Sequence, residues 1–183
     1  MAKATPRAVL FDLWGTLVAP RADRRDVVSH LMAADLGVDG DRFVAAVRDS
    51  HAERFTGRMG TLAETLRVLA RRCGGDPEAA ALERAAARRL EVTRELLVAD
   101  HQTLAALDAL RDAGVRLGLV SDSSIETPTV WSGCRLASRI AATSFSCLLG
   151  VRKPHPGIYL HVTRRLGVVP EQCLYVGDGD SRE

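Results

Sequence analysis

The sequence predicts an α/β fold in which helices cover both faces of a parallel β-sheet. Three short runs rich in Val and Leu suit buried parallel strands: Ala8–Phe11, Val115–Val120 and Cys173–Val176. Amphipathic stretches that suit helices separate these runs, and such alternation is typical of a parallel sheet. With 183 residues, the chain can bury one core domain and a modest insertion.

The first strand is followed by a long stretch that contains no convincing strand. Glycine-containing breaks divide it into four expected helices: Asp23–Asp35, Asp41–Phe55, Thr61–Arg72 and Pro77–Val98. The pattern predicts a helical insert over residues 19–100 and a core domain formed by residues 1–18 and 101–183.

Two further helices are expected beyond the insert. His101–Ala113 repeats leucines on one face, and Gly114 follows as a C-terminal stop. Pro156–Leu166 has a similar pattern, with Gly167 behind it. Between them, Ser146–Leu149 is a weaker candidate for a fourth strand.

The composition excludes several functional classes. Hydrophobic residues make up 46% and charged residues 26%, as in soluble globular proteins, and the net charge of +2 predicts neither nucleic-acid nor membrane binding. Residues 1–7 lack the core of a signal peptide, and no apolar run approaches the roughly 20 residues that span a bilayer. Four cysteines without a CxxC pair favour reduced thiols over zinc. We expect a cytoplasmic protein with a small-molecule substrate; the sequence leaves its oligomeric state open.

Polar residues follow the expected strands at the point where each strand ends. Asp12 follows the first strand, Ser121 and Asp122 the second, and Asp178 the last, while Lys153 lies just past the weaker fourth candidate. Ligands bind beyond the carboxyl ends of the strands in open parallel sheets. The sequence therefore places carboxylates, a hydroxyl and an ammonium at one edge of the sheet.

Each of these residues also has a simpler structural interpretation. Asp12 is a nucleophile held by a strand before a turn at Gly15, or it caps that turn. Ser121 binds a phosphate oxygen, or it is the N-cap of a following helix. Lys153 points back at the site, or it is an exposed lysine. Asp178 is a magnesium ligand, or it forms an Asp-Gly turn.

In this order, the residues resemble the motifs of the haloacid dehalogenase-like hydrolase superfamily. Phe11–Leu17 looks like the first motif, Ser121 matches the second, Lys153–Pro156 the third and Gly177-Asp178 the opening of the fourth. The resemblance implies a Rossmann-like core. The insert looks like the small helical cap of the subgroup that includes phosphoglycolate phosphatase-like enzymes and 2-haloacid dehalogenases.

The resemblance also implies roles for these residues. Asp12 would attack the substrate and form a covalent aspartyl intermediate, which water then hydrolyses. Thr16, Ser121 and Asp122 would contact the substrate, and Lys153 would stabilise its charge.

A magnesium ion is implied by the same resemblance. In the phosphatases of the superfamily, Mg²⁺ is bound by the first aspartate, the backbone carbonyl two residues later and the fourth-motif aspartate. Here these are Asp12, Trp14 and Asp178. Glu183 lies where related phosphatases often have a second acid, and with Asp180 it forms an acidic cluster that favours a cation.

Trp14 is the departure from the phosphatase pattern. Phosphatases of the superfamily usually carry an aspartate at this position as general acid and base, whereas an indole offers only an N–H donor. Family dehalogenases carry a tyrosine there and need no metal, and Arg21, Arg24 and Arg25 offer a halide cradle. Three readings stay open: a metal-dependent phosphate-monoester hydrolase, a 2-haloacid dehalogenase, and an impaired relative that binds an anion or a partner.

Three expectations concern packing. The chain stops inside the fourth motif, which predicts a C-terminal truncation and a bare edge at Cys173–Val176. Trp131 is expected to pack in the core rather than to bind substrate. The arginine pairs at 71–72 and 88–89 are expected on a solvated face of the insert.

Overall fold

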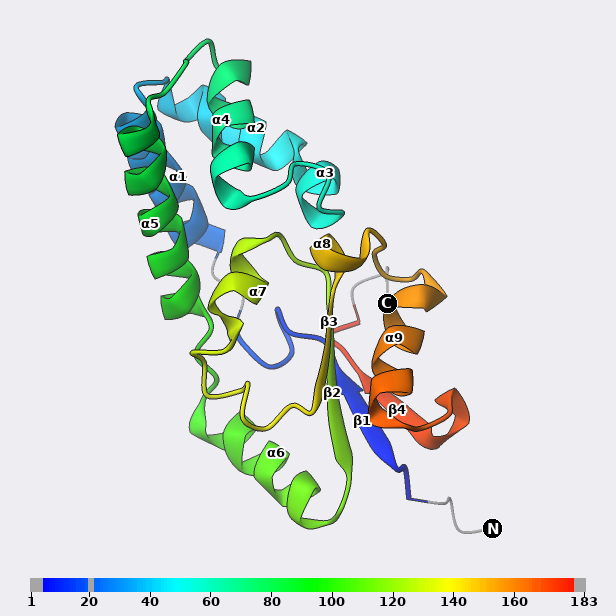
Figure 1. The fold of residues 1–183 in the computed structure, drawn as a ribbon. Helices are drawn as coiled ribbons and strands as arrows, with labels where there is room; N and C mark the ends of the chain where they lie inside the picture. The colour runs from blue at the N-terminus through cyan, green and yellow to red at the C-terminus, as the bar shows by residue number, and fades with distance from the viewer. Residues whose placement is uncertain (1–4, 20–21, 180–183) are drawn as a thin grey trace.

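The protein contains a four-stranded parallel sheet in the order β3-β2-β1-β4. The computed structural model describes residues 5–19 and 22–179. Its strands are β1 (Ala8–Phe11), β2 (Arg116–Ser121), β3 (Ala142–Phe145) and β4 (Cys173–Val176) (Figure 1). β1 lies in the middle and pairs with both β2 and β4. The three main strands were therefore predicted correctly to within one residue.

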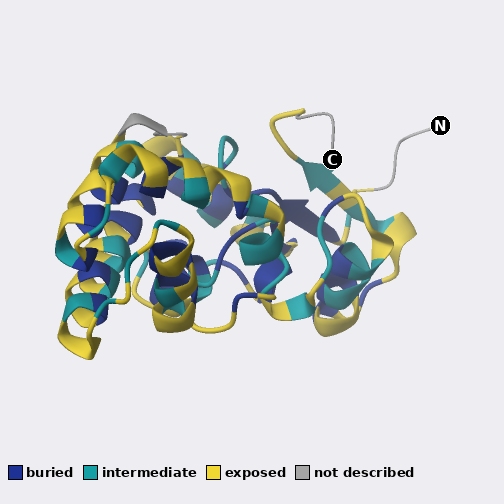
Figure 2. Ribbon diagram, turned by 90° about the horizontal axis from the view of Figure 1, so that it is seen from above, coloured by how far each residue is buried: buried dark blue, intermediate teal, exposed yellow. Residues whose placement is uncertain are grey.

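Helices cover both faces of this sheet, as the sequence predicted. Val9 belongs to a buried cluster on the face covered by α6 (His101–Asp112), whereas Leu10 belongs to the cluster on the face covered by α9 (Pro156–Leu166). This alternation follows from the strand period of two, which sends successive side chains to opposite faces. Figure 2 shows the buried residues between the helices, with exposed residues on the outer surfaces.

Gly118 allows α9 to pack closely on the middle of the sheet. A Cβ atom at this position would lie 2.5 Å from Val162 Cγ1 and 2.7 Å from Leu10 Cδ2, which is closer than carbon atoms pack. Because α9 follows the loop that carries Lys153, this close packing fixes the height of that loop above the sheet.

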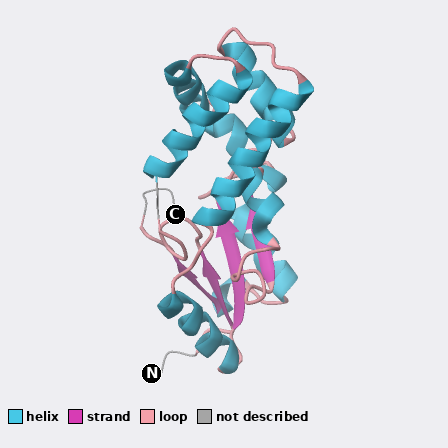
Figure 3. Cartoon of the chain, turned by 90° about the vertical axis from the view of Figure 1, so that its left-hand side faces the viewer, coloured by secondary structure: helices cyan, strands magenta, loops and turns pink. Residues whose placement is uncertain are grey.

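A layer of helices stands over the carboxyl ends of the strands (Figure 3). It consists of α1 (Ala22–Leu36), α2 (Gly40–Asp49), α3 (His51–Phe55), α4 (Leu62–Arg72) and α5 (Ala79–Leu96), and we refer to residues 22–96 as the helical segment. The segment has its own buried cluster, in which Met32, Phe43 and Leu66 are each at most 2% exposed. Thr61 starts α4 with a capping box to Glu64.

The structure corrects three predicted elements. Ser146–Leu149 is the short helix α8 rather than a strand; the strand is the preceding run of small and polar residues, Ala142–Phe145, which carries a weak strand signal. The helix expected over 41–55 is interrupted at Ser50, and α7 (Glu126–Trp131) was not predicted.

The helical segment also meets the core at α8. Gly57 has a φ of +69°, and a Cβ atom there would lie 2.0 Å from the carbonyl oxygen of Cys147. The contact therefore brings backbone against backbone and requires glycine.

Other expectations about packing are confirmed in part. Trp131 is buried and meets Phe145 edge-on, with ring centroids 5.7 Å apart. The four cysteines are free thiols. Within the described residues β4 is an edge strand, preceded by the short 3₁₀ helix η1 (Pro170–Gln172), and Leu174 on β4 is 52% exposed. No described helix is long and apolar enough to cross a membrane.

We expect Gly118→Ala to lower the free energy of unfolding by about 1–3 kcal/mol, because the added methyl group overpacks the contact with α9. Chemical denaturation measures this loss. Gly133→Ala is the matched control, since the nearest atom to its added Cβ lies 3.6 Å away, and it should change stability by less than about 0.5 kcal/mol. Equal effects of the two substitutions would contradict the prediction.

Candidate active site

Asp12 is held by a tight loop that begins where β1 ends. Its backbone N–H donates to the carbonyl of Val176 at 2.9 Å, so the residue stays attached to β4. The loop then closes on itself, because Gly15 donates to Val18 at 2.8 Å and Val18 donates to Leu13 at 3.0 Å. The φ of +95° at Gly15 is accessible to glycine with little strain. The carboxylate is therefore positioned by the sheet.

Lys153 forms a buried ion pair with Asp12. Its Nζ lies 2.8 Å from Asp12 Oδ1, and each side chain is only 7% exposed. Nζ also donates to the Tyr175 hydroxyl at 3.2 Å, and Thr16 Oγ1 donates to Asp12 Oδ2 at 3.3 Å. The interpretation of Lys153 as an exposed surface lysine is wrong. Both oxygens of Asp12 are oriented by neighbouring donors.

Asp122 holds the loop that carries Lys153. Its Oδ1 accepts the backbone N–H of Lys153 at 3.0 Å, and its Oδ2 accepts Nε of Arg152 at 3.2 Å. The sequence suggested that Asp122 contacts substrate. In this structure its carboxylate contacts the loop that carries Lys153, an arrangement that suits a positioning residue.

Ser121 presents a buried hydroxyl to the same edge. It is the last residue of β2 and is 0% exposed, and its Oγ has no hydrogen-bond partner among the described residues. Leaving a buried hydroxyl unpaired is unfavourable, so such a group is suited to a ligand oxygen. The N-cap interpretation is wrong, because α7 begins at Glu126 and Ile125 is its N-cap.

The position of Asp178 brings a second carboxylate to the loop after β1. A Cβ atom at Gly15 would lie 2.3 Å from Asp178 Oδ2, so this carboxylate packs directly on the Gly15 backbone. The backbone carbonyl of Trp14 belongs to the same loop after β1. Asp12, Asp178 and this carbonyl form an all-oxygen donor set, which is the chemistry that Mg²⁺ prefers.

The described residues contain no group of three His, Cys, Asp or Glu side chains that could hold a metal ion. A magnesium site in this part of the chain therefore depends on the backbone carbonyl as well as on the two carboxylates. The proposed additional acids, Asp180 and Glu183, lie outside the described residues, as does Arg21 of the halide cradle.

Trp14 packs between the sheet core and the helical segment. Its partly buried indole contacts the buried clusters of both layers. The guanidinium carbon of Arg25, from α1, lies 4.4 Å from the centroid of the ring, within the range of a cation–π contact. Arg24 is directed elsewhere and pairs with Glu95 at 2.6 Å. The tryptophan therefore couples the first motif to the helical segment.

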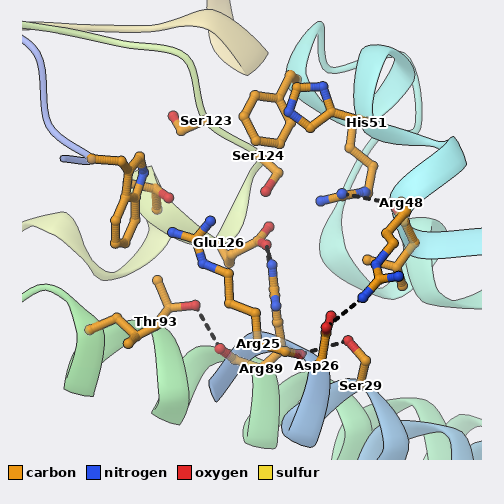
Figure 4. A pocket seen from close by; sticks show the side chains of 16 residues that line it. Arg25, Asp26, Ser29, Arg48, His51, Arg89, Thr93, Ser123, Ser124 and Glu126 are labelled. Atoms are coloured by element: carbon orange, nitrogen blue, oxygen red, sulfur yellow. Dashed lines mark hydrogen bonds and ion pairs between the residues drawn. The ribbon is translucent and has the colours of Figure 1, made fainter. Parts of the chain in front are cut away.

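A cleft of about 200 Å³ opens between the two layers beside Trp14 (Figure 4). Among the residues that line it, Trp14, Ser123 and Glu126 come from the core, and Arg25, Arg54 and Arg89 come from the helical segment.

Arg89 and Glu126 join the layers at this cleft. Arg89 Nη2 lies 2.5 Å from Glu126 Oε1, and the two side chains are 12% and 5% exposed. The expectation that Arg89 lies on a solvated face is wrong, whereas Arg71, Arg72 and Arg88 are exposed. Arg89 lies four residues before the buried Thr93 on α5, a helical spacing that could have placed it on the inner face.

The electrostatics of the cleft reflect this burial. Burial raises the pKa of the Glu126 carboxyl, but the charges of Arg89 and Arg54 outweigh that effect and lower its pKa to about 2. Burial lowers the pKa of Arg54 to about 10. The pKa of Arg25 is also lowered, by burial first and then by the charge of Arg89. The cleft therefore holds cations that are poorly solvated.

The fold and the site together define a hydrolase built on a parallel α/β core. A carboxylate at the end of β1, a buried lysine and a free serine hydroxyl converge at the carboxyl edge of the sheet. A family model described as a haloacid dehalogenase-like hydrolase matches residues 6–181. The chain belongs to this family, and it is a phosphatase-like hydrolase with phosphoglycolate phosphatase-like and haloacid dehalogenase-like relatives.

Three known proteins illustrate the similarity. The phosphoglycolate phosphatase of Salmonella typhimurium strain LT2 is 33% identical over 190 residues, which cover 94% of this chain and 73% of the relative. A predicted HAD-like family hydrolase from Porphyromonas gingivalis has a similar fold, with a TM-score of 0.67, 22% identity and coverage of 98% and 85% of the two chains. The L-2-haloacid dehalogenase of Xanthobacter autotrophicus follows with a TM-score of 0.57, 20% identity and coverage of 93% and 69%.

We expect the Arg89–Glu126 pair to make stability depend on pH in acid. The pKa of Glu126 is lower in the folded state than in the unfolded state. Its ionised carboxylate therefore stabilises the folded state at pH values above the unfolded pKa near 4.5, and this stabilisation is lost as the pH falls toward about 2. Between about pH 6 and about pH 3, Glu126→Gln should therefore lose about 2 kcal/mol less unfolding free energy than the wild type.

Chemical denaturation at both pH values measures this difference. Glu95→Gln is the control, because its ion pair with Arg24 is half exposed. Wild type and Glu126→Gln that respond equally to acid would contradict the prediction.

Proposed function

We propose that this protein hydrolyses small phosphate monoesters with the help of Mg²⁺, through an aspartyl-phosphate formed on Asp12. The observation that carries the proposal is the buried Asp12–Lys153 pair beside the unpaired hydroxyl of Ser121. The ammonium of Lys153 orients the Asp12 carboxylate for attack, and the hydroxyl of Ser121 is available to donate a hydrogen bond to an anionic ester. The relatives named phosphoglycolate phosphatase support phosphate esters as the substrate class.

The residues have distinct roles in this proposal. A carboxylate oxygen of Asp12 forms a bond to phosphorus, and the bond between phosphorus and the ester oxygen breaks, releasing an alkoxide that takes a proton from water to become the alcohol. Water then attacks the phosphorus, which releases inorganic phosphate and restores the carboxylate. Ser121 and Thr16 donate to phosphate oxygens, and Lys153 offsets their charge. Asp122 acts through the loop as a positioning residue.

Mg²⁺ would be held by Asp12, Asp178 and the carbonyl of Trp14, and it would supply positive charge next to the transferred phosphoryl group. The helical segment is proposed to act as a cap, with the core formed by residues 1–18 and 101–183. Its position over the carboxyl ends of the strands supports this division, because the cleft there is lined by both layers.

A dehalogenase activity is the second candidate. The observation that favours it is the aromatic ring of Trp14 under the guanidinium of Arg25, since both groups offer hydrogen-bond donors or positive charge to a halide without a metal. Asp12 would then attack carbon and expel the halide. An impaired enzyme that only binds an anion is the third reading, because Trp14 supplies no proton-transfer group.

The nucleophile is tested by Asp12→Asn. We expect wild-type protein to release phosphate from p-nitrophenyl phosphate only with Mg²⁺, and the variant to be inactive because a neutral amide is a poor nucleophile. Asp112→Asn, an exposed change on α6, is the control that should keep full activity. Metal-independent halide release from 2-chloropropionate, together with no phosphatase activity, would instead favour the dehalogenase.

The proton-transfer role at position 14 is tested by comparing Trp14→Asp with Trp14→Asn. Both variants lose the packing of the indole, so their difference reports the carboxyl group alone. We expect kcat of Trp14→Asp to exceed that of Trp14→Asn by about 10²–10⁴, the usual contribution of general acid–base catalysis. If the two variants have equal kcat values, the absence of a proton-transfer group at position 14 is not what limits turnover.

A further inference from the structure

We propose that Phe55, on α3 of the helical segment, is a positioning residue for Lys153 and acts through Arg152. The ring of Phe55 holds Arg152, and Arg152 in turn helps to hold the loop that aims the Lys153 ammonium at Asp12. The inference rests on the proposed function in one respect, because it takes Asp12 and Lys153 as the reacting pair. It makes the contact of α3 with the core a condition for full activity.

Arg152 has one contact in each layer. Its guanidinium carbon lies 5.5 Å from the centroid of the Phe55 ring, within the range of a cation–π contact. Its Nε donates to Asp122 Oδ2, on the core, at 3.2 Å. The side chains of Arg152 and Asp122 are only 20% and 15% exposed. Water and salt therefore screen this pair less than they screen a pair on the open surface.

Asp122 passes the constraint on to Lys153. One of its oxygens accepts from Arg152, and the other accepts the backbone N–H of Lys153 at 3.0 Å. A carboxylate that is fixed at one oxygen is less free to turn away from the donor at its other oxygen. The side chain of Lys153 then ends 2.8 Å from Asp12 Oδ1. The ring of Phe55 is thus connected to the reacting pair through Arg152 and Asp122 in turn.

The ring of Phe55 is itself held in a definite place. It stacks on the ring of His51, with a distance of 3.8 Å between the ring centroids and an interplanar angle of 29°. The guanidinium carbon of Arg54 lies 5.6 Å from its centroid. A ring that its neighbours hold in this way is preorganised for the contact with Arg152.

The part of the core that contacts α3 leads directly to Lys153. α3 lies beside α8 (Figure 1), and a Cβ atom at Gly57 would lie 2.0 Å from the carbonyl oxygen of Cys147. Cys147 and Arg152 lie near the two ends of one short stretch of chain, and Lys153 follows Arg152 directly. A displacement of α3 from the core therefore releases this stretch at two points, and the second point is next to Lys153.

A direct contact with the substrate is the alternative role for Phe55, because its ring also lines the cleft beside Trp14. Arg152 is not among the described residues that line this cleft. The two roles therefore differ in the effect of replacing Phe55 when Arg152 has already been replaced.

A double-mutant cycle with p-nitrophenyl phosphate and Mg²⁺ distinguishes the two roles. Phe55→Leu and Arg152→Gln should each lower kcat by about three- to thirtyfold, the factor that corresponds to a cation–π contact, and should change KM less. In the Arg152→Gln background, Phe55→Leu should lower kcat by less than about twofold more, because the contact is already lost.

Two further variants serve as controls. Phe55→Tyr keeps the aromatic face and should retain about half or more of the wild-type kcat. Leu148→Ala, on α8, changes a side chain that is 60% exposed and should keep full activity. Where Phe55→Leu fails to fold, Phe55→Met replaces it with the same expected results, since methionine fills a similar space without an aromatic face.

Effects of Phe55→Leu and Arg152→Gln that multiply in the double variant would overturn the inference, because Phe55 would then act independently of Arg152. A Phe55→Leu variant with the wild-type kcat would also overturn it, and the hydrolysis of the ester by both proteins would retain the proposed function.

Amide hydrogen exchange measured by NMR separates the inference from the proposed function, because it needs no substrate. The Lys153 N–H is bonded to Asp122, and we expect it to exchange at least about threefold faster in Phe55→Leu and in Arg152→Gln than in the wild type. The Asp12 N–H, which is bonded within the sheet, is the internal reference and should exchange at an unchanged rate. A purely local loosening of α3 would leave both amides unchanged.

Faster exchange at Lys153 with an unchanged reference supports the inference even if the wild type hydrolyses no phosphate ester. An unchanged rate at Lys153 in both variants would overturn the inference, whatever the wild type hydrolyses.

Discussion

The buried pair between Asp12 and Lys153 is the interaction around which the rest of the molecule is arranged. Two charges removed from water are unfavourable unless each is matched closely, and here the match is supplied by segments 141 residues apart. The central strand delivers the carboxylate, and α9 together with the Asp122 carboxylate fixes the loop that delivers the ammonium. Close packing at Gly118 and the tight loop at Gly15 are therefore requirements of the site as much as of the fold.

The structure gives Trp14 a packing role that the sequence did not indicate. In the sequence it is the residue that replaces an expected proton-transfer group. In the structure its ring contacts both buried clusters and carries Arg25 on its face. One side chain thus supplies a contact between the layers in place of the expected acid–base group. The tryptophan at position 14 replaces the aspartate that is usual in phosphatases, which weakens the phosphatase hypothesis, and its ring lines the charged cleft.

Much of the core and of the candidate site could be predicted because both follow from local patterns. The main strands are short apolar runs. The rule that ligands bind at the carboxyl ends of parallel strands predicted that Asp12, Ser121 and Lys153 lie at the same edge of the sheet. The third strand was missed because its small and polar residues give little local signal. Arg89 was misplaced because a charged residue on a helix is usually solvated, and only the contact with Glu126, 37 residues away, makes its burial favourable.

The glycine contact between the helical segment and α8 has a consequence for movement. Gly57 meets the Cys147 carbonyl with no side chain between them. A contact made by a long side chain loses rotamer entropy each time it forms, whereas this contact has no rotamers to lose. The helical segment can separate from the core and return at this point without a penalty for ordering side chains. The Arg89–Glu126 pair and Trp14, by contrast, join the layers through side chains that must be ordered when the layers meet.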